Sequence, residues 1–298
     1  MLRAFGSLGF VTVGIRVTSP RPWQGETHMA IDIAMAAARA PAVRPTIRRI
    51  GLADLRDAFR LGVRDYGEHR TDVLFLCLIY PIIGLALGRL TLGQHLLPLI
   101  FPMLAGFALL GPFAAVGLYQ ISLRREQGRV STWRNVFDVV HARALGAILL
   151  LGLVLCALFV IWLQVAQGIF ELCFGATPTD SPAAFIGMVL TTQAGWAMIV
   201  LGNLAGLAFA VVAFTLSVVS FPLLIDRDLG ATTGEQLSVA VLTSIRAVRT
   251  NPGPMAAWAL LIAVLLALGS LPALVGLVVV MPVLGHASWH LYRRVVTP

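Results

Sequence analysis

Five long stretches with almost no charged side chains are the feature that most constrains this chain. They cover residues 73–88, 90–123, 144–170, 182–225 and 251–292. A helix needs about 20 predominantly apolar residues to cross the hydrocarbon core of a bilayer. Of the 298 residues, 58% are apolar and 12% are charged, and a soluble domain needs about twice that share of charge to cover its surface. We therefore expect a polytopic membrane protein.

Two of these stretches are longer than one span. The last is interrupted by a Gly-Ser-Leu-Pro turn at residues 269–272, which predicts a helix on each side. The fourth is divided at residues 193–195, with an interfacial segment on the outer side over residues 182–192 and a membrane helix over residues 195–225. The expected fold class is thus an all-α polytopic membrane protein with six transmembrane helices in three hairpins.

Arginine supplies all of the basic side chains that are charged at neutral pH, because the chain has 22 arginines and no lysine. Seventeen of them fall in residues 44–72, 122–143, 226–251 and 293–294, whereas the connections between these segments contain Arg89 alone. Cytoplasmic loops are enriched in Lys and Arg. We therefore expect a multi-pass protein of the bacterial inner (plasma) membrane with both termini in the cytoplasm.

Three of the cytoplasmic segments are expected to contain an amphipathic helix just before an odd-numbered span. The apolar faces consist of Leu52, Leu55, Phe59, Val63 and Tyr66 in the first, Trp133, Val136, Phe137 and Val140 in the second, and Leu237, Val241, Ile245 and Val248 in the third. Aligning Ala58 with Ala240 also aligns Gly62 with Ser244. The sequence thus predicts a threefold repeat of amphipathic helix, span, outer turn and span.

The N-terminal segment differs from the rest of the chain. Residues 1–49 contain several prolines and no sustained periodicity, which is typical of a disordered tail. The expected domains are this tail, with Met29 and Met35 as alternative starts, and a six-helix transmembrane domain over residues 50–296.

His286 and His290 are the candidate metal ligands. They lie four residues apart on one face of the last span, a spacing that can hold a metal ion or a haem iron. They also stand beside Trp289 and Tyr292 at the cytoplasmic end, where hydrogen-bonded interface histidines are commoner. We favour the interface interpretation and assign neither a metal nor a cofactor.

Asp226, Arg227 and Asp228 form a candidate polar cluster directly after the fourth span. A carboxylate at that depth can carry protons or cations. A solvated stop signal with a local ion pair is the commoner role, and the middle of each predicted span lacks the Asp, Glu or Arg that would continue a relay.

Motifs of enzymes are absent from the sequence. It contains no G-x-S-x-G, no G-x-x-x-x-G-K-[ST] and no H-E-x-x-H. We expect a non-enzymatic integral membrane protein with a structural, accessory or transporter-like role. The alternative is a haem-binding or oxidase-associated membrane subunit. The expected partners are the lipid bilayer and either another membrane protein or further copies of the chain, and no nucleic acid.

Three stretches carry a resemblance to a known family. They are FPLLIDRDLG at residues 221–230, NPGPMAAWAL at residues 251–260 and MPVLGHASWHLYRRVV at residues 281–296. Together they resemble the bacterial predicted integral membrane proteins of domain of unknown function family 2189. The resemblance extends over about residues 50–296 and is most specific in the C-terminal third. It implies a multi-span inner-membrane protein and supplies no catalytic residues.

Overall fold

The chain divides into two compact units, Met1–Pro41 and Ala42–Pro298, and the fold below is that of the second. In the computed structural model, the residues described are 45–68, 78, 81–86, 89, 99–175 and 181–297. Nearly all of the regular structure in these residues is helical, apart from a pair of two-residue strands. The second unit is therefore an all-α fold, as the sequence predicted.

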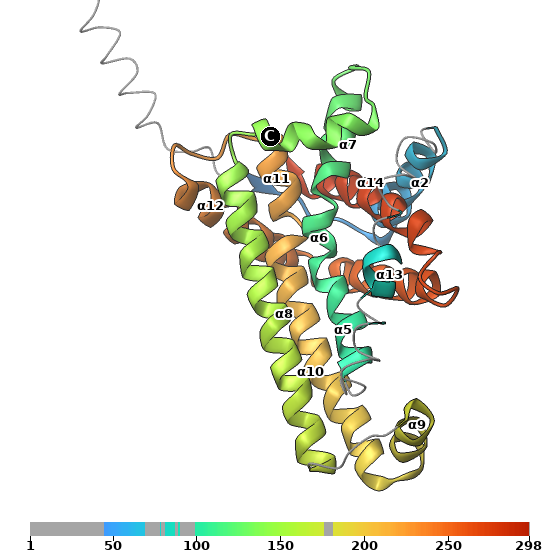
Figure 1. The fold of residues 1–298 in the computed structure, drawn as a ribbon. Helices are drawn as coiled ribbons and strands as arrows, with labels where there is room; N and C mark the ends of the chain where they lie inside the picture. The colour runs from blue at the N-terminus through green and yellow to red at the C-terminus, as the bar shows by residue number, and fades with distance from the viewer. Residues whose placement is uncertain are drawn as a thin grey trace, which may run out of the picture. The chain divides into compact units, whose positions relative to one another are not determined.

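Long apolar helices dominate this unit. Within the described residues, three are long and apolar enough to cross a membrane: Leu145–Phe174, Gln193–Asp226 and Pro252–Ser270. They correspond to α8 (Leu145–Phe174), to α10 (Gln193–Ser217) with α11 (Ser220–Asp226), and to α13 (Pro252–Ser270). Helices α8 and α10 pack side by side (Figure 1). With 30 residues, α8 is about 45 Å long, which exceeds the hydrocarbon core of a bilayer.

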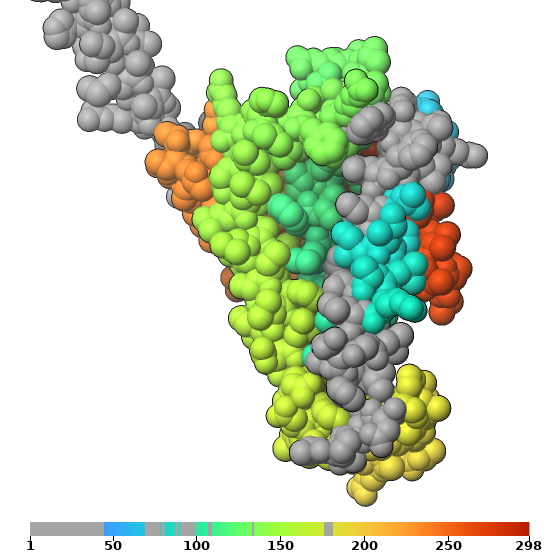
Figure 2. Space-filling view, in the orientation of Figure 1, coloured from blue at the N-terminus to red at the C-terminus, as the bar shows by residue number. Residues whose placement is uncertain are grey.

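The outer surfaces of these helices are apolar. Leu153 and Ile161 are exposed on α8, and Leu204 and Leu207 are exposed on α10. Figure 2 shows α8 forming a continuous surface along the front of the molecule. Such surfaces are stable in lipid, where the backbone hydrogen bonds are satisfied within each helix. The helices thus have the composition and the exposed surface of an integral membrane protein.

The described residues contain three such helices where the sequence predicted six spans. The predicted span at residues 73–88 lies mostly outside the described residues. The predicted span at residues 90–123 is broken within its described part, into α5 (Ile100–Phe107), η2 (Ala108–Leu110), α6 (Gly111–Ala114) and α7 (Val116–Glu126). Pro112, in the first turn of α6, contributes to this break because it has no backbone N–H to donate.

Two predicted interruptions are confirmed. The fourth apolar stretch divides into α9 (Pro182–Thr191) and α10, with Thr192 as the N-cap of α10. The last stretch divides into α13, which ends at Ser270, and α14 (Leu277–Val295).

Helix α14, which corresponds to the predicted sixth span, is an internal helix. Nearly all of its side chains are buried, from Met281 to Tyr292 without a fully exposed position. It packs against α2 (Leu52–Glu68), α7 and α13. Its mixture of apolar, histidine and arginine side chains therefore meets protein on most sides.

The three segments predicted to be cytoplasmic begin their helices in the same way. In α2, η3 (Trp133–His141) and α12 (Thr233–Thr250), the third residue of the helix accepts a hydrogen bond from the backbone N–H of the residue before the helix. The donor and acceptor pairs are Gly51 and Asp54 at 2.9 Å, Thr132 and Asn135 at 2.8 Å, and Thr232 and Glu235 at 3.1 Å. One of the three, η3, is a 3-10 helix and not an α-helix.

Each of these helices packs on the end of a different long segment. Helix α2 packs on α14, η3 on α7, and α12 on α10 and α11. The helices α7, α11 and α14 in turn contact one another. Because α7, α11 and α14 contact one another in pairs, the three contacts close into a ring at one end of the bundle (Figure 1).

The buried face of α2 differs from the predicted apolar face. Leu55, Ala58 and Gly62 are buried, whereas Leu52 and Val63 are exposed. A Cβ atom added to Gly62 would lie 2.6 Å from the backbone nitrogen of the α14 residue that it faces. Small residues face α14 because they let the two backbones approach this closely, which larger apolar side chains do not allow.

Residues 45–49 were predicted as tail and are part of the structured unit. Strand β1 (Thr46–Ile47) pairs antiparallel with β2 (Val296–Thr297). The side chain of Asn251 accepts a hydrogen bond from Ile50 N at 2.8 Å and donates one to Arg48 O at 3.1 Å. The structured chain thus begins before residue 50 and is fixed to its own C-terminal end.

Candidate functional site

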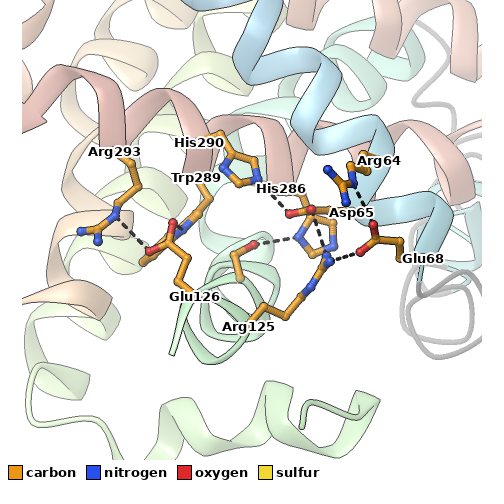
Figure 3. A network of polar contacts seen from close by, with 10 residues as sticks. Arg64, Asp65, Glu68, Arg125, Glu126, His286, Trp289, His290 and Arg293 are labelled. Carbon is orange, nitrogen blue, oxygen red and sulfur yellow. Dashed lines mark hydrogen bonds and ion pairs between the residues drawn. The ribbon is translucent and has the colours of Figure 1, made fainter. Parts of the chain in front are cut away.

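The largest group of interacting polar side chains lies where α14 meets α2 and α7, at the arginine-rich end of the bundle (Figure 3). We call this group the α14 network. Its members are Arg64, Asp65 and Glu68 from α2, Ser122, Arg125 and Glu126 from α7, and His286, Trp289, His290 and Arg293 from α14.

Asp65 lies near the centre of the α14 network. One carboxylate oxygen is 2.8 Å from Nε2 of His290, and the other is 3.0 Å from a guanidinium nitrogen of Arg125. Burial raises the pKa of Asp65, but the hydrogen bond from His290 and the charges of His290, Arg125 and His286 outweigh this effect and hold the pKa below its usual value. Asp65 is therefore a carboxylate that joins α2 to both α7 and α14.

Glu68 continues the network one turn further along α2. It accepts a hydrogen bond from Arg64 on its own helix at 2.9 Å, and it pairs with Arg125 of α7. The hydrogen bond from Arg64 lowers the pKa of Glu68 and outweighs the small opposing effect of desolvation. Arg125 thus holds two carboxylates of α2 at once.

His286 lies deeper in the same network. Its Nδ1 is 2.7 Å from the hydroxyl oxygen of Ser122 on α7. The two side chains are nearly inaccessible, since Ser122 is 2% exposed and His286 is 1% exposed. A serine beside a histidine can act as a nucleophile, but a substrate cannot reach a hydroxyl buried to this degree. The pair therefore joins α7 to α14.

The two candidate metal ligands, His286 and His290, take different partners. His286 is hydrogen-bonded to Ser122, whereas His290 is hydrogen-bonded to Asp65. Within the described part of the chain, no three His, Cys, Asp or Glu side chains are grouped so that they could hold a metal ion. Their spacing therefore places them at two successive contacts of α14 with its neighbours.

The predicted polar cluster after the fourth span divides into two. Asp226 accepts hydrogen bonds from the hydroxyl of Tyr292 at 2.5 Å and from Arg293 at 3.0 Å, and Arg227 lies 3.4 Å away. Asp228 instead pairs with Arg143 at the surface, at 2.9 Å. Asp226 thus ties the end of α11 to α14, while Asp228 is part of a separate exposed ion pair.

Glu126 connects the α14 network to the contacts of Asp226. It accepts a hydrogen bond from Nε1 of Trp289 at 3.0 Å and pairs with Arg293 at 3.0 Å. Because Arg293 also binds Asp226, the C-terminal turns of α14 are held by α2, α7 and α11 together. The arrangement can fix the positions of these helices relative to one another.

The break between α10 and α11 is closed by a side chain of α12. The helix is interrupted between Ser217 and Ser220, where α10 ends and α11 begins. Ser244 of α12 donates a hydrogen bond to Thr215 O at 2.7 Å and accepts one from Val219 N at 3.3 Å. The backbone groups at this interruption are therefore bound by protein.

Most members of the α14 network were not predicted from the sequence. Helical periodicity places Asp65 opposite the predicted apolar face of α2, and no sequence pattern singles out Glu68, Ser122, Arg125 or Glu126. One signal was present: Asp65 follows Ala58 and Gly62 on the face that the small residues define. The partners themselves come from segments far apart in the chain, which helical periodicity does not relate.

Comparison with known proteins gives a family match for the middle of the chain. A family model described as predicted integral membrane protein (DUF2189) matches residues 100–226, from α5 to the end of α11. The family resemblance is thus confirmed, but residues 251–260 and 281–296, which appeared most specific, lie beyond the matched range. No curated protein and no solved structure matches the chain.

Proposed function

Because residues 100–226 match the family model described as predicted integral membrane protein (DUF2189), we propose that the chain is a non-enzymatic protein of the bacterial inner membrane with a structural or accessory role. In this role the chain supports another membrane protein or assembles with further copies of itself. The family and the apolar helices supply the premise that it is membrane-embedded. The particular role rests on the polar contacts at the arginine-rich end.

We also propose the topology. The arginines of α2, α7, α12 and α14 gather at one end of the bundle, which is the distribution expected of a cytoplasmic end. Six spans in three hairpins, each preceded by a cytoplasmic helix, would place both termini there. The shared helix starts and the ring of contacts support this threefold repeat.

One observation carries the accessory role: the polar side chains of the α14 network bind each other. Asp65, Glu68, Glu126 and Asp226 are each paired with an arginine or a histidine of another helix. Removing one partner of such a pair destabilises a protein by more than the intact pair stabilises it. They are therefore suited to fixing one arrangement of helices, which is what a supporting subunit requires.

A transporter-like role is the second candidate, favoured by the broken helices near Pro112 and Pro222. In transporters, interrupted helices present backbone groups to a substrate near the middle of the membrane. Here Ser244 binds the backbone at the break before Pro222. Transport would require a second arrangement in which this hydrogen bonding opens.

Hydrogen exchange of the protein in lipid nanodiscs distinguishes these roles. A supporting subunit should give one protected population for peptides that cover residues 214–226. Two populations with different masses, interconverting slowly, would instead favour transport. A Ser244→Ala variant serves as the control for an opened break, because it removes the hydroxyl that binds both sides.

The accessory role itself is tested in the host membrane. We expect deletion of the gene to lower the amount of one membrane complex, and the intact chain to restore it and to migrate with it in a native gel. The visible spectrum of the purified protein should show no Soret band. A Soret band that disappears in a His286→Ala, His290→Ala variant would replace this proposal with the haem-binding alternative.

A further inference from the structure

The charges of α2 are distributed unevenly between its two sides. The helix contains four carboxylates and three arginines, so its sequence alone suggests a slightly acidic helix. The structure separates the two signs. The carboxylates turn toward other parts of the protein, whereas Arg56, Arg60 and Arg64 lie on the exposed side.

Each carboxylate of α2 is paired within the protein. Asp54 is bound by Arg48 and Arg294, and Asp57 lies 3.6 Å from Arg294. The other two, in the α14 network, are bound by Arg125 and by their further partners. The negative charge of the helix is thus matched by cations from outside it.

The outer side of α2 combines positive charge with exposed apolar side chains. Among the described residues, Arg56 and Arg60 form no ion pair. Next to them around the helix lie Leu52, which is 67% exposed, and Val63, which is 45% exposed. An apolar strip beside a basic strip is typical of helices that lie in the headgroup region of a membrane.

The neighbour of α2 also points to lipid. Helix α13 contacts α2 and exposes Leu260, Val264 and Leu268 on its surface. These side chains belong to one of the helices that are long and apolar enough to cross a membrane. Helix α2 therefore lies beside a helix whose own surface is suited to lipid.

From these observations we propose that the outer side of α2 is a binding surface for anionic phospholipids. Leu52 and Val63 insert below the level of the phosphates, and Arg56 and Arg60 bind the phosphate groups. Charge complementarity selects lipids with a net negative headgroup over zwitterionic ones. This proposal is independent of whether the protein supports a partner or transports a solute.

The depth of the apolar strip is tested with a fluorescent label in the full-length protein. Cys77, Cys156 and Cys173 are replaced by alanine, and bimane is attached at Val63→Cys. The matched control is Val130→Cys, which is 85% exposed in the turn that extends beyond the helices between α7 and η3 (Figure 1). In vesicles of phosphatidylcholine and phosphatidylglycerol, lipids with a spin label on the acyl chain should quench bimane at position 63 and not at position 130.

The lipid selectivity is tested by removing the charges. For the wild type, spin-labelled phosphatidylglycerol should quench the label at position 63 more strongly than spin-labelled phosphatidylcholine. An R56Q, R60Q variant should lose this preference by about fivefold for each arginine at low salt. An R129Q, R143Q variant removes the same charge from the same end of the molecule and should keep the preference.

Two results would overturn the proposal. A label at position 63 that no lipid quenches would mean that the strip faces water or a protein partner. Equal quenching by the two lipids, unchanged in the R56Q, R60Q variant, would mean that the helix contacts lipid without selecting anionic headgroups. Because Arg56 and Arg60 are exposed, both variants should elute as monodisperse folded protein.

Discussion

The contact between α2 and α14 depends on Gly62, and a single methyl group should disrupt it. A Cβ atom at Gly62 would lie 2.6 Å from the Cβ, 2.6 Å from the nitrogen and 2.7 Å from the Cα of Ala287. Two of these three atoms belong to the backbone of α14, so a rotamer change cannot relieve the overlap. The helices must separate instead, and the Asp65 contacts with α14 must lengthen.

We expect Gly62→Ala to lower the free energy of unfolding by about 1–3 kcal/mol, the usual cost of overpacking. For a protein of moderate size this corresponds to about 2–4 °C in the unfolding midpoint for each kcal/mol. The assay is thermal unfolding in detergent, followed by tryptophan fluorescence. Gly67→Ala is the matched control on the same helix, because an added Cβ there meets nothing within 4 Å.

The control variant should be neutral or more stable by up to about 1 kcal/mol, since alanine favours helix more than glycine does. In a Gly62→Ala, Ala287→Gly double variant, stability should recover only in part, because the nitrogen and Cα of residue 287 remain. If Gly62→Ala were as stable as Gly67→Ala, the two helices would not approach as closely as described, and the assignment of the buried face of α2 would be wrong.

Three further predictions concern the polar contacts and the topology. Because the pKa of Asp65 is lowered in the folded protein, its ionised form adds stability that is complete above the unfolded pKa and is lost as the pH falls through the folded pKa. Asp65→Asn should therefore lower the free energy of unfolding by about 2 kcal/mol near neutral pH. The difference in thermal midpoint between this variant and the wild type should shrink below about pH 4. Ser244→Ala should lower the free energy of unfolding by about 1–3 kcal/mol, because it leaves the buried backbone N–H of Val219 without a partner. The control Ser238→Ala, at an exposed site on the same helix, should change the thermal midpoint little. Equal effects of the two variants would contradict this account. Reporter fusions test the orientation: we expect a cytoplasmic signal at Arg129 and Gly234, and a periplasmic signal at Thr179, which lies outside the described residues. A periplasmic signal at Arg129 or Gly234 would refute the arginine argument.

Much of the helix pattern could be predicted from the sequence, because the interruptions have local causes. The turn at residues 269–272 and the division near residue 193 follow from Gly, Pro and Thr at those places, and both interruptions are observed. The break around Pro112 was harder to place. Uniform hydropathy along a span does not indicate where the backbone hydrogen bonds of the helix are interrupted. A single proline is compatible with a kink as well as with separate helices.

The contacts at the arginine-rich end could not be predicted by the same means, since they join residues distant in the chain. His290 and Asp65 are 225 positions apart, and Trp289 and Glu126 are 163 positions apart. The alignment of Gly62 with Ser244 was a better guide to these contacts, because both residues are buried. The alignment identified the inner face of α2 and α12, although the larger apolar side chains suggested a different one.

Helix α2 shows why composition alone misleads about the charge that a helix presents on its outer side. Counting its charges gives more carboxylates than arginines, which argues against an anionic surface as its partner. The count fails because the relevant quantity is the charge that remains after internal pairing. Arg294, Arg125 and Arg48 come from other segments and neutralise the carboxylates on the inner side. A sequence-based prediction of lipid binding must therefore know which face of the helix is buried, and in α2 that face is set by Ala58 and Gly62.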